Sequence, residues 1–189
     1  MKRRLLAIGC PATFLLFCLL LYLTGGIHII WGGNTGSPPS RNAEKARMLS
    51  AAELAGFEPG PNDPLMQLSD RMPDPTADQR VFSDQANTLH IEDDLQFCVS
   101  DADAFANYAS FLDAVKAVVT TISSHSSPSI GSQSDEYLGT DSSGHSTVAI
   151  AFQEGEVLGA VFVAVGTGKV DTAYAEAFAG AQDHKISSG

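Results

Sequence analysis

The sequence predicts an α+β fold in which helices flank an antiparallel sheet with a central hairpin, preceded by one transmembrane helix. Three stretches carry this prediction. Residues 147–165 have the apolar content and turn of a β-hairpin, and residues 105–122 repeat apolar side chains at helical spacing. Residues 5–31 contain no Asp, Glu, Lys or Arg. We therefore divide the chain into a membrane segment (1–31), a linker (32–41) and an α+β domain (42–189).

The uncharged stretch from Leu5 to Trp31 is long enough to cross a lipid bilayer. As a helix it reaches roughly 40 Å, and the hydrocarbon core is roughly 30 Å thick. Basic residues occupy positions 2–4, and the next charge is Arg41. This asymmetry favours a cytoplasmic N-terminus. We expect a single-pass protein of the cell membrane with its C-terminal domain outside and the lipid bilayer as partner of Leu5 to Trp31.

Two other interpretations of this stretch stay open. Thr24 and Gly26 have the spacing of a signal-peptidase site, although the apolar run before them is longer than usual for a cleaved signal. Residues 7–10, Ala-Ile-Gly-Cys, look like the lipobox of a lipoprotein, although the apolar run continues well beyond Cys10. A secreted protein or a lipoprotein would also place the domain outside the cell.

The part after the membrane segment is strongly acidic. All 22 acidic residues but only eight of the 11 basic residues lie there, a net charge of −14. Such a field repels phosphate backbones, so no nucleic-acid partner is expected. Cys98 is the one cysteine in this part, so no disulfide can form within it. We interpret Cys98 as buried apolar filler, with an intermolecular disulfide as the alternative.

The first elements after the membrane segment are a linker and a helix. Residues 32–41 are rich in Gly, Ser and Pro, which is linker composition. Ser40 is a candidate cap for a helix over 42–55, which Gly56 ends. The apolar side of this helix contains Met48, Leu49 and Leu54.

A proline-rich loop and short strands follow. The prolines in 58–83 predict no regular structure apart from a helical turn near 65–68. Residues 88–92 and 95–99 alternate between apolar and polar side chains. One or two short strands are therefore expected between 81 and 99.

The longest predicted helix begins at Ser100, which with Asp103 forms a signature related to the capping box. Its apolar stripe, at spacings of three and four, is Phe105, Tyr108, Leu112, Val115, Val119 and Ile122. Such a stripe is typical of a helix face in the core. The serine-rich residues 123–129 are predicted to be a flexible turn.

The predicted hairpin follows a strand at 135–139 and a loop at 141–145. Its strands, 147–153 and 156–165, are joined by Glu154 and Gly155. This turn places Phe152 opposite Val157 and Val148 opposite Val161. Both faces are apolar, which indicates a central position in the sheet.

A final helix over 173–185 is capped by Asp171 or Thr172. One side of this helix combines Tyr174, Phe178 and Ala181, extended by Ala177. His184 near its C-terminal end is favourable there when charged.

Three parts of the sequence contain residue types that are found in catalytic or ligand-binding sites. Residues 165–170 suggest a phosphate loop, but Val163 replaces the first glycine and Val170 replaces the magnesium-binding Ser or Thr. The serines beside His145 and His125 suggest a hydrolase, but no Gly-x-Ser-x-Gly motif accompanies them. We interpret both serine-rich segments as polar loops.

The third part contains a set of acidic residues and one histidine: His90, Glu92, Asp93, Asp94, Asp101 and Asp103. An EF-hand would need oxygen ligands where Phe105 and Leu112 stand. We interpret the set as surface and capping residues, with a loose calcium site as the alternative. No catalytic, cofactor-binding or metal-binding residue is assigned, and no enzyme is expected.

Four segments carry a resemblance to a known family. They are 49–56 (Leu-Ser-Ala-Ala-Glu-Leu-Ala-Gly), 131–139 (Gly-Ser-Gln-Ser-Asp-Glu-Tyr-Leu-Gly), 148–163 and the Ala-rich helix at 173–185. Together they resemble the PknH-like extracytoplasmic domains of actinobacterial lipoproteins and of a mycobacterial receptor kinase. The resemblance implies a helix-flanked antiparallel sheet with a ligand-binding cleft. The kinase's outer domain has paired cysteines, which Cys98 alone does not reproduce, and no kinase domain is expected here.

These observations lead to one expected function and two alternatives. We expect a membrane-tethered extracytoplasmic binding or sensor-like domain without catalytic activity, whose partner is a small ligand or an envelope protein. The first alternative is a structural accessory subunit of a membrane or envelope complex. The second is a secreted hydrolase.

Overall fold

The computed structural model describes residues 46–50, 53, 69–70, 79–83 and 88–189. The predicted membrane segment, the linker and the helical turn near 65–68 lie outside these residues. Among the described residues, no helix combines the length and the hydropathy that a membrane span requires.

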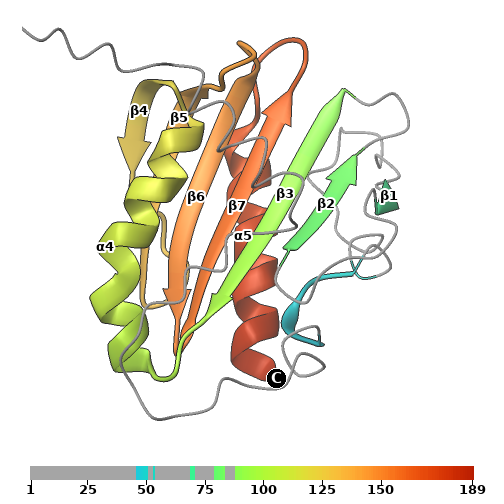
Figure 1. Cartoon of the computed structure of the whole chain (residues 1–189). Coiled ribbons are helices and arrows are strands. Elements are labelled where there is room, and N and C mark those ends of the chain that lie inside the picture. Colours follow the sequence, from blue (N-terminus) through green and yellow to red (C-terminus); the bar gives the residue numbers. More distant parts are fainter. Residues whose placement is uncertain (1–45, 51–52, 54–68, 71–78, 84–87) are drawn as a thin grey trace, which may run out of the picture. The chain divides into compact units, whose positions relative to one another are not determined.

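The domain is built on one antiparallel sheet of seven strands in the order β1-β2-β3-β7-β6-β5-β4 (Figure 1). The strands are β1 (Ser69–Asp70), β2 (Gln79–Ser83), β3 (Leu89–Phe97), β4 (Thr121–Ser126), β5 (Gln133–Thr140), β6 (Ser146–Glu154) and β7 (Val157–Val165). Helix α4 (Asp101–Val118) lies across one face and α5 (Thr172–Ser188) across the other. The predicted α+β class and the central position of the hairpin are confirmed.

The register of the hairpin differs from the prediction. The turn is Gly155-Glu156, so Phe152 lies opposite Gly159 and Val148 opposite Val163. Gly155 has φ +54°, a conformation that favours glycine and positions the turn one residue later. Each partner moves by two residues, and the alternation of side chains therefore leaves the predicted faces unchanged.

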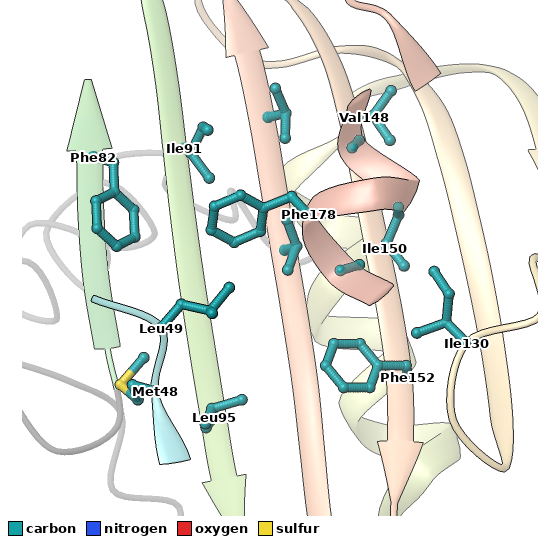
Figure 2. Close-up of a cluster of buried hydrophobic side chains, with 14 of the residues drawn as sticks. Met48, Leu49, Phe82, Ile91, Leu95, Ile130, Val148, Ile150, Phe152 and Phe178 are labelled. Carbon is teal, nitrogen blue, oxygen red and sulfur yellow. The ribbon is translucent and has the colours of Figure 1, made fainter. Parts of the chain in front are cut away.

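The two faces of the hairpin carry side chains of different size. Val148, Ile150 and Phe152 of β6 pack toward α5, where Phe178 meets Phe82 of β2 with ring centroids 6.0 Å apart (Figure 2). The opposite face carries small side chains, chiefly Ala149, Ala151 and Ala160, against α4. The alternation of large and small residues in the strands therefore gives each helix its own core.

Helix α4 begins as predicted and ends earlier. The Ser100 hydroxyl accepts a hydrogen bond from the Asp103 N–H at 3.2 Å, which confirms the cap. The ends of the predicted stripe are wrong, since Phe105 is 68% exposed and Ile122 is 46% exposed. Ala104 takes the sheet-facing place of Phe105, and Ile122 belongs to β4, a strand where a turn was predicted.

Helix α5 is capped by Asp171, whose carboxylate accepts from the Ala173 N–H at 3.0 Å. Phe178 is buried as predicted, and Tyr174 and Ala181 pack against the core. Ala177 is exposed, contrary to the prediction, because the buried stripe passes through Ala175, Ala179, Gln182 and Ile186 instead.

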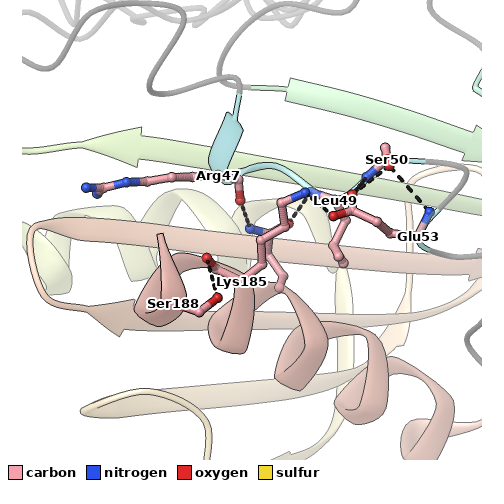
Figure 3. Close-up of polar contacts among 7 residues, drawn as sticks. Arg47, Leu49, Ser50, Glu53, Lys185 and Ser188 are labelled. Atoms are coloured by element: carbon pink, nitrogen blue, oxygen red, sulfur yellow. Dashed lines mark hydrogen bonds and ion pairs between the residues drawn. The ribbon is translucent and has the colours of Figure 1, made fainter.

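The segment Ala46–Ser50 packs against α5 through Gln182. The Gln182 Nε2 donates to the Arg47 carbonyl at 2.7 Å, and its Oε1 accepts from the Leu49 N–H at 2.9 Å. Glu53 pairs with Lys185 of α5 (Figure 3). Lys185 and Ser50 together lower the pKa of the Glu53 carboxyl to about 2.

Two predictions for the N-terminal part of the domain are wrong. A continuous helix over 42–55 was expected, but Met48, Leu49 and Ser50 are not helical, and Ser50 forms a capping box with Glu53. Strands β1 and β2 lie inside the stretch 58–83, for which a loop was expected. Burial of Met48 and Leu49 is confirmed.

Candidate functional site

A cleft of about 380 Å³ opens at the N-terminal end of α4. It is lined by residues from three separate parts of the sequence: Asp101, Ala102, Phe105, Ser132, Gln133 and Gln153. Its volume falls within the range of small-molecule pockets. The cleft therefore lies between the end of β6, the start of β5 and the first turn of α4.

Gln153 holds the walls of the cleft together. This side chain is 1% exposed, and its Nε2 donates to Asp101 Oδ1 at 2.7 Å and to the Gly155 carbonyl at 3.1 Å. Its Oε1 accepts from the Gln133 Nε2 at 2.6 Å. Buried amides that use both ends in this way fix their neighbours in one arrangement. The polar groups of the cleft are consequently pre-positioned.

Phe105 is the apolar component of the cleft. At 68% exposed it is the most exposed of the large apolar side chains that the structure describes. A ring in this position gains apolar burial when a molecule covers it. The cleft thus combines one available aromatic surface with fixed amide groups.

A polar network continues from the cleft along α4. Tyr108 lies one turn beyond Phe105, and its hydroxyl lies 3.1 Å from Asp135 Oδ2 and 3.2 Å from the Ala151 carbonyl. His125 Nε2 lies 2.7 Å from Asp135 Oδ1. Burial and the nearby Asp135 charge raise the pKa of Tyr108, so its hydroxyl stays protonated and donates. The network joins α4, β4 and β5.

Tyr137 supports the outer end of this network. The His125 ring stacks on the Tyr137 ring with centroids 4.7 Å apart and planes 7° apart. The Lys116 Nζ lies 5.3 Å from the centre of the same ring. A cation at this distance from an aromatic ring is attracted to its face. Tyr137 thus connects the edge strand to α4.

Two serine hydroxyls near His125 donate to groups other than the histidine. In β4, Ser123 donates to the Leu138 carbonyl at 3.0 Å and Ser126 to Glu136 at 2.8 Å. In the 141–145 loop, Asp141 accepts from the backbone N–H groups of Ser143 and His145. Within the part of the chain that is described, no serine hydroxyl is hydrogen-bonded to His125 or His145, so neither histidine forms a serine triad there.

The acidic residues considered as metal ligands do not converge. No group of three or more His, Cys, Asp or Glu side chains suited to a metal ion occurs among residues 46–50, 53, 69–70, 79–83 and 88–189. The alternation of β3 separates buried Asp93 from His90, Glu92 and Asp94 on the other face. Asp101 and Asp103 lie in the first turn of α4.

Three further residues from the sequence analysis have clear positions. Cys98 is buried, and burial raises the pKa of its thiol, which favours the filler interpretation. His184 is exposed near the end of α5. Val170, after the glycines between β7 and α5, is buried, and its N–H donates to Ser146 at 3.1 Å.

The interpretation of Asp93 as a surface residue is wrong, because its side chain points to the buried face of β3. Asp93 is 0% exposed and lies opposite Arg80 of β2. Neither carboxyl oxygen has a hydrogen-bond partner among the described residues. Burial raises the pKa of Asp93 to about 8, although the charge of Arg80 opposes this shift. Asp93 is therefore largely protonated at neutral pH.

Comparison with known proteins does not assign this chain to a family. No protein-family model matches the chain, and no curated protein matches it.

Proposed function

We propose that the chain is a non-enzymatic binding domain, tethered to the membrane by Leu5 to Trp31 and exposed outside the cell, with the cleft at the start of α4 as its binding site. The observation that carries the proposal is the exposed Phe105 ring beside the fixed amides of Gln133 and Gln153. An aromatic surface with a few oriented polar groups is the usual composition of a small-molecule site.

The charge of the chain narrows the class of ligand. Asp101 lies in the cleft, and the chain carries a net charge of −11. This field disfavours anions. A neutral or cationic small molecule, with an apolar group for Phe105 and an amide or hydroxyl for Gln133, fits the cleft best.

The sequence supports the tethering and the sensor-like role. The uncharged stretch 5–31, after basic residues 2–4, favours a single span with the domain outside. The resemblance of residues 49–186 to PknH-like extracytoplasmic domains agrees with a ligand-binding function. Because the chain carries no assigned catalytic group, any signal would pass to an envelope partner.

A second candidate is a structural accessory subunit without a ligand. The observation in its favour is the hairpin itself, since α4 and α5 cover both of its faces and leave its side chains almost fully buried. A sheet that is filled in this way serves as a scaffold.

Ligand capture distinguishes the two candidates. The full chain is purified in mild detergent, and molecules that stay bound are detected by native mass spectrometry. We expect one bound small molecule whose occupancy decreases at least tenfold in Phe105→Ala. Val118→Ala is the matched control, because Val118 is exposed at the other end of α4 and outside the cleft. A wild-type chain that carries no ligand, or a ligand that Phe105→Ala retains, would contradict the proposed site.

A further inference from the structure

Strand β4 forms an exposed edge of the sheet. All six of its residues, Thr121 to Ser126, are exposed, and β5 is its one neighbour in the described sheet (Figure 1). A strand in this position presents backbone N–H and C=O groups without partners along its outer side. Such an edge is able to accept another strand.

This edge lacks the charges that normally protect one. Residues 117–134 contain no Asp, Glu, Lys or Arg, in a chain with 11 basic and 22 acidic residues. Natural edge strands are commonly protected by charged side chains, lysine above all. The sequence leaves β4 uncharged where the rest of the domain is acidic.

A bulge between Ile122 and Ser124 interrupts β4 without ending it. The extra residue, Ser123, donates its hydroxyl to the Leu138 carbonyl of β5 at 3.0 Å. Regular pairing with β5 resumes over Ser124, His125 and Ser126. Among the described strands, none pairs with the outer edge of these residues.

We propose that a second copy of this chain adds to β4, so that the two β4 strands pair antiparallel about a two-fold axis and extend the sheet across both copies. The charge of the chain favours a second copy as the partner of β4. Two chains of net charge −11 repel each other. They approach with the least repulsion where neither carries a charge, and that is the stretch containing β4.

Side-chain exposure is the second argument. Domains that bind a foreign peptide at a sheet edge use side-chain pockets for specificity, whereas every side chain of β4 is exposed. Pairs of Ser and Thr across strands suit a symmetric, self-complementary contact. Apolar surface is available beside these residues. Val118 at the C-terminal end of α4 is 42% exposed, and Ile122 near the start of β4 is 46% exposed.

The size of the contact sets its strength. One strand of six residues in each copy provides less than the roughly 800 Å² per partner of a standard interface. The association is therefore weak and depends on concentration. Confinement of both copies to one membrane, as in the proposed function, raises their effective concentration.

Charge exchange at Ser124 tests the proposal. The full chain in mild detergent is followed by light scattering over a concentration series, and differently tagged copies are mixed and co-purified. Wild type is expected to dimerise. Ser124→Glu alone and Ser124→Lys alone are each expected to raise the dissociation constant at least tenfold, because Ser124 lies near the middle of β4 and like charges of the two copies come close in an antiparallel pair. A mixture of the two variants is expected to restore the dimer.

Ser110→Glu is the matched control, since Ser110 is exposed on α4 and adds the same charge away from β4. It is expected to leave the dissociation constant unchanged. A wild-type chain that stays monomeric, a dimer that Ser124→Glu leaves intact, or a mixture that fails to re-associate would each overturn the proposal.

Discussion

Replacement of Gly159 by alanine tests how the register of the central hairpin is determined. A Cβ at this position would lie 2.2 Å from Phe152 Cζ and 2.5 Å from Cε1, well inside van der Waals contact. The Phe152 side chain is 0% exposed and is enclosed by other residues of the core, so a shift of its ring displaces its neighbours. We infer that the absence of a side chain at Gly159 is what allows the ring to lie across the neighbouring strand.

The expected magnitude follows from two opposing effects. Over-packing a filled core costs about 1–3 kcal/mol, while removal of a glycine from a strand interior returns about 0.5–1 kcal/mol. Because the added Cβ would lie 2.2 Å from the ring, the over-packing cost should be in the upper part of its range, and Gly159→Ala should destabilise the domain by about 1–2.5 kcal/mol. For a domain of this size the midpoint of thermal unfolding should decrease by about 3–8 °C.

The assay is thermal unfolding of the purified chain followed by far-ultraviolet circular dichroism. Gly180→Ala is the control, because its added Cβ would have no described atom within 4 Å apart from the neighbouring backbone of α5, and α5 gains a better helix former. The control should stabilise the domain by about 0.5–1 kcal/mol. Combination of Gly159→Ala with Phe152→Leu should cost less than the sum of the single changes. A Gly159→Ala chain as stable as wild type would refute this reasoning.

Two other changes have defined outcomes. Burial raises the pKa of Asp93 from 3.8 to about 8, so between these pH values the folded chain keeps a proton that the unfolded chain releases. The contribution of Asp93 to the free energy of unfolding is therefore fully present below about pH 4 and is lost as the pH rises to 8. In Asp93→Asn, the free energy of unfolding in urea should fall less between pH 5 and pH 8.5 than in wild type. The substitution should also stabilise the domain by roughly 2–4 kcal/mol at pH 7. Gln182→Leu leaves the Leu49 N–H and the Arg47 carbonyl unpaired and should cost about 1–3 kcal/mol. Trypsin should then cut after Arg47 faster than in wild type.

Each of these outcomes has a clear opposite. An Asp93→Asn chain with the pH dependence of wild type would show that another carboxyl causes the decline, for example Glu136, whose pKa is also raised by burial. If trypsin cuts wild type and Gln182→Leu at equal rates, the buried amide does not hold the Ala46–Ser50 segment.

The elements that could be predicted are those whose signals are local. Ser100 and Asp171 cap their helices through side chains three or fewer residues away, and the hairpin strands are apolar on both faces. Strand β4 was missed because a strand exposed on every residue shows no apolar alternation. The register was missed because it depends on the positive φ of Gly155 and on the space that Gly159 leaves for the Phe152 ring, and the alternation of side chains shows neither.

The cleft was not predictable, because it joins residues from three distant segments: 101–105, 132–133 and 153. One signal was present in the sequence. Gln153 is an amide at the end of an apolar run, and a buried amide needs partners. Gln182 gives the same signal in α5, where it binds the Ala46–Ser50 segment. Isolated amides within apolar patterns therefore mark contacts between distant segments.

Protease treatment of intact cells that express the chain tests whether a binding domain is held outside the cell by its N-terminal segment. Added protease is expected to remove the domain, while a short fragment containing Leu5 to Trp31 stays in the membrane fraction. A soluble chain that begins after Gly26, or a domain that is protected until the cells are broken, would contradict this expectation.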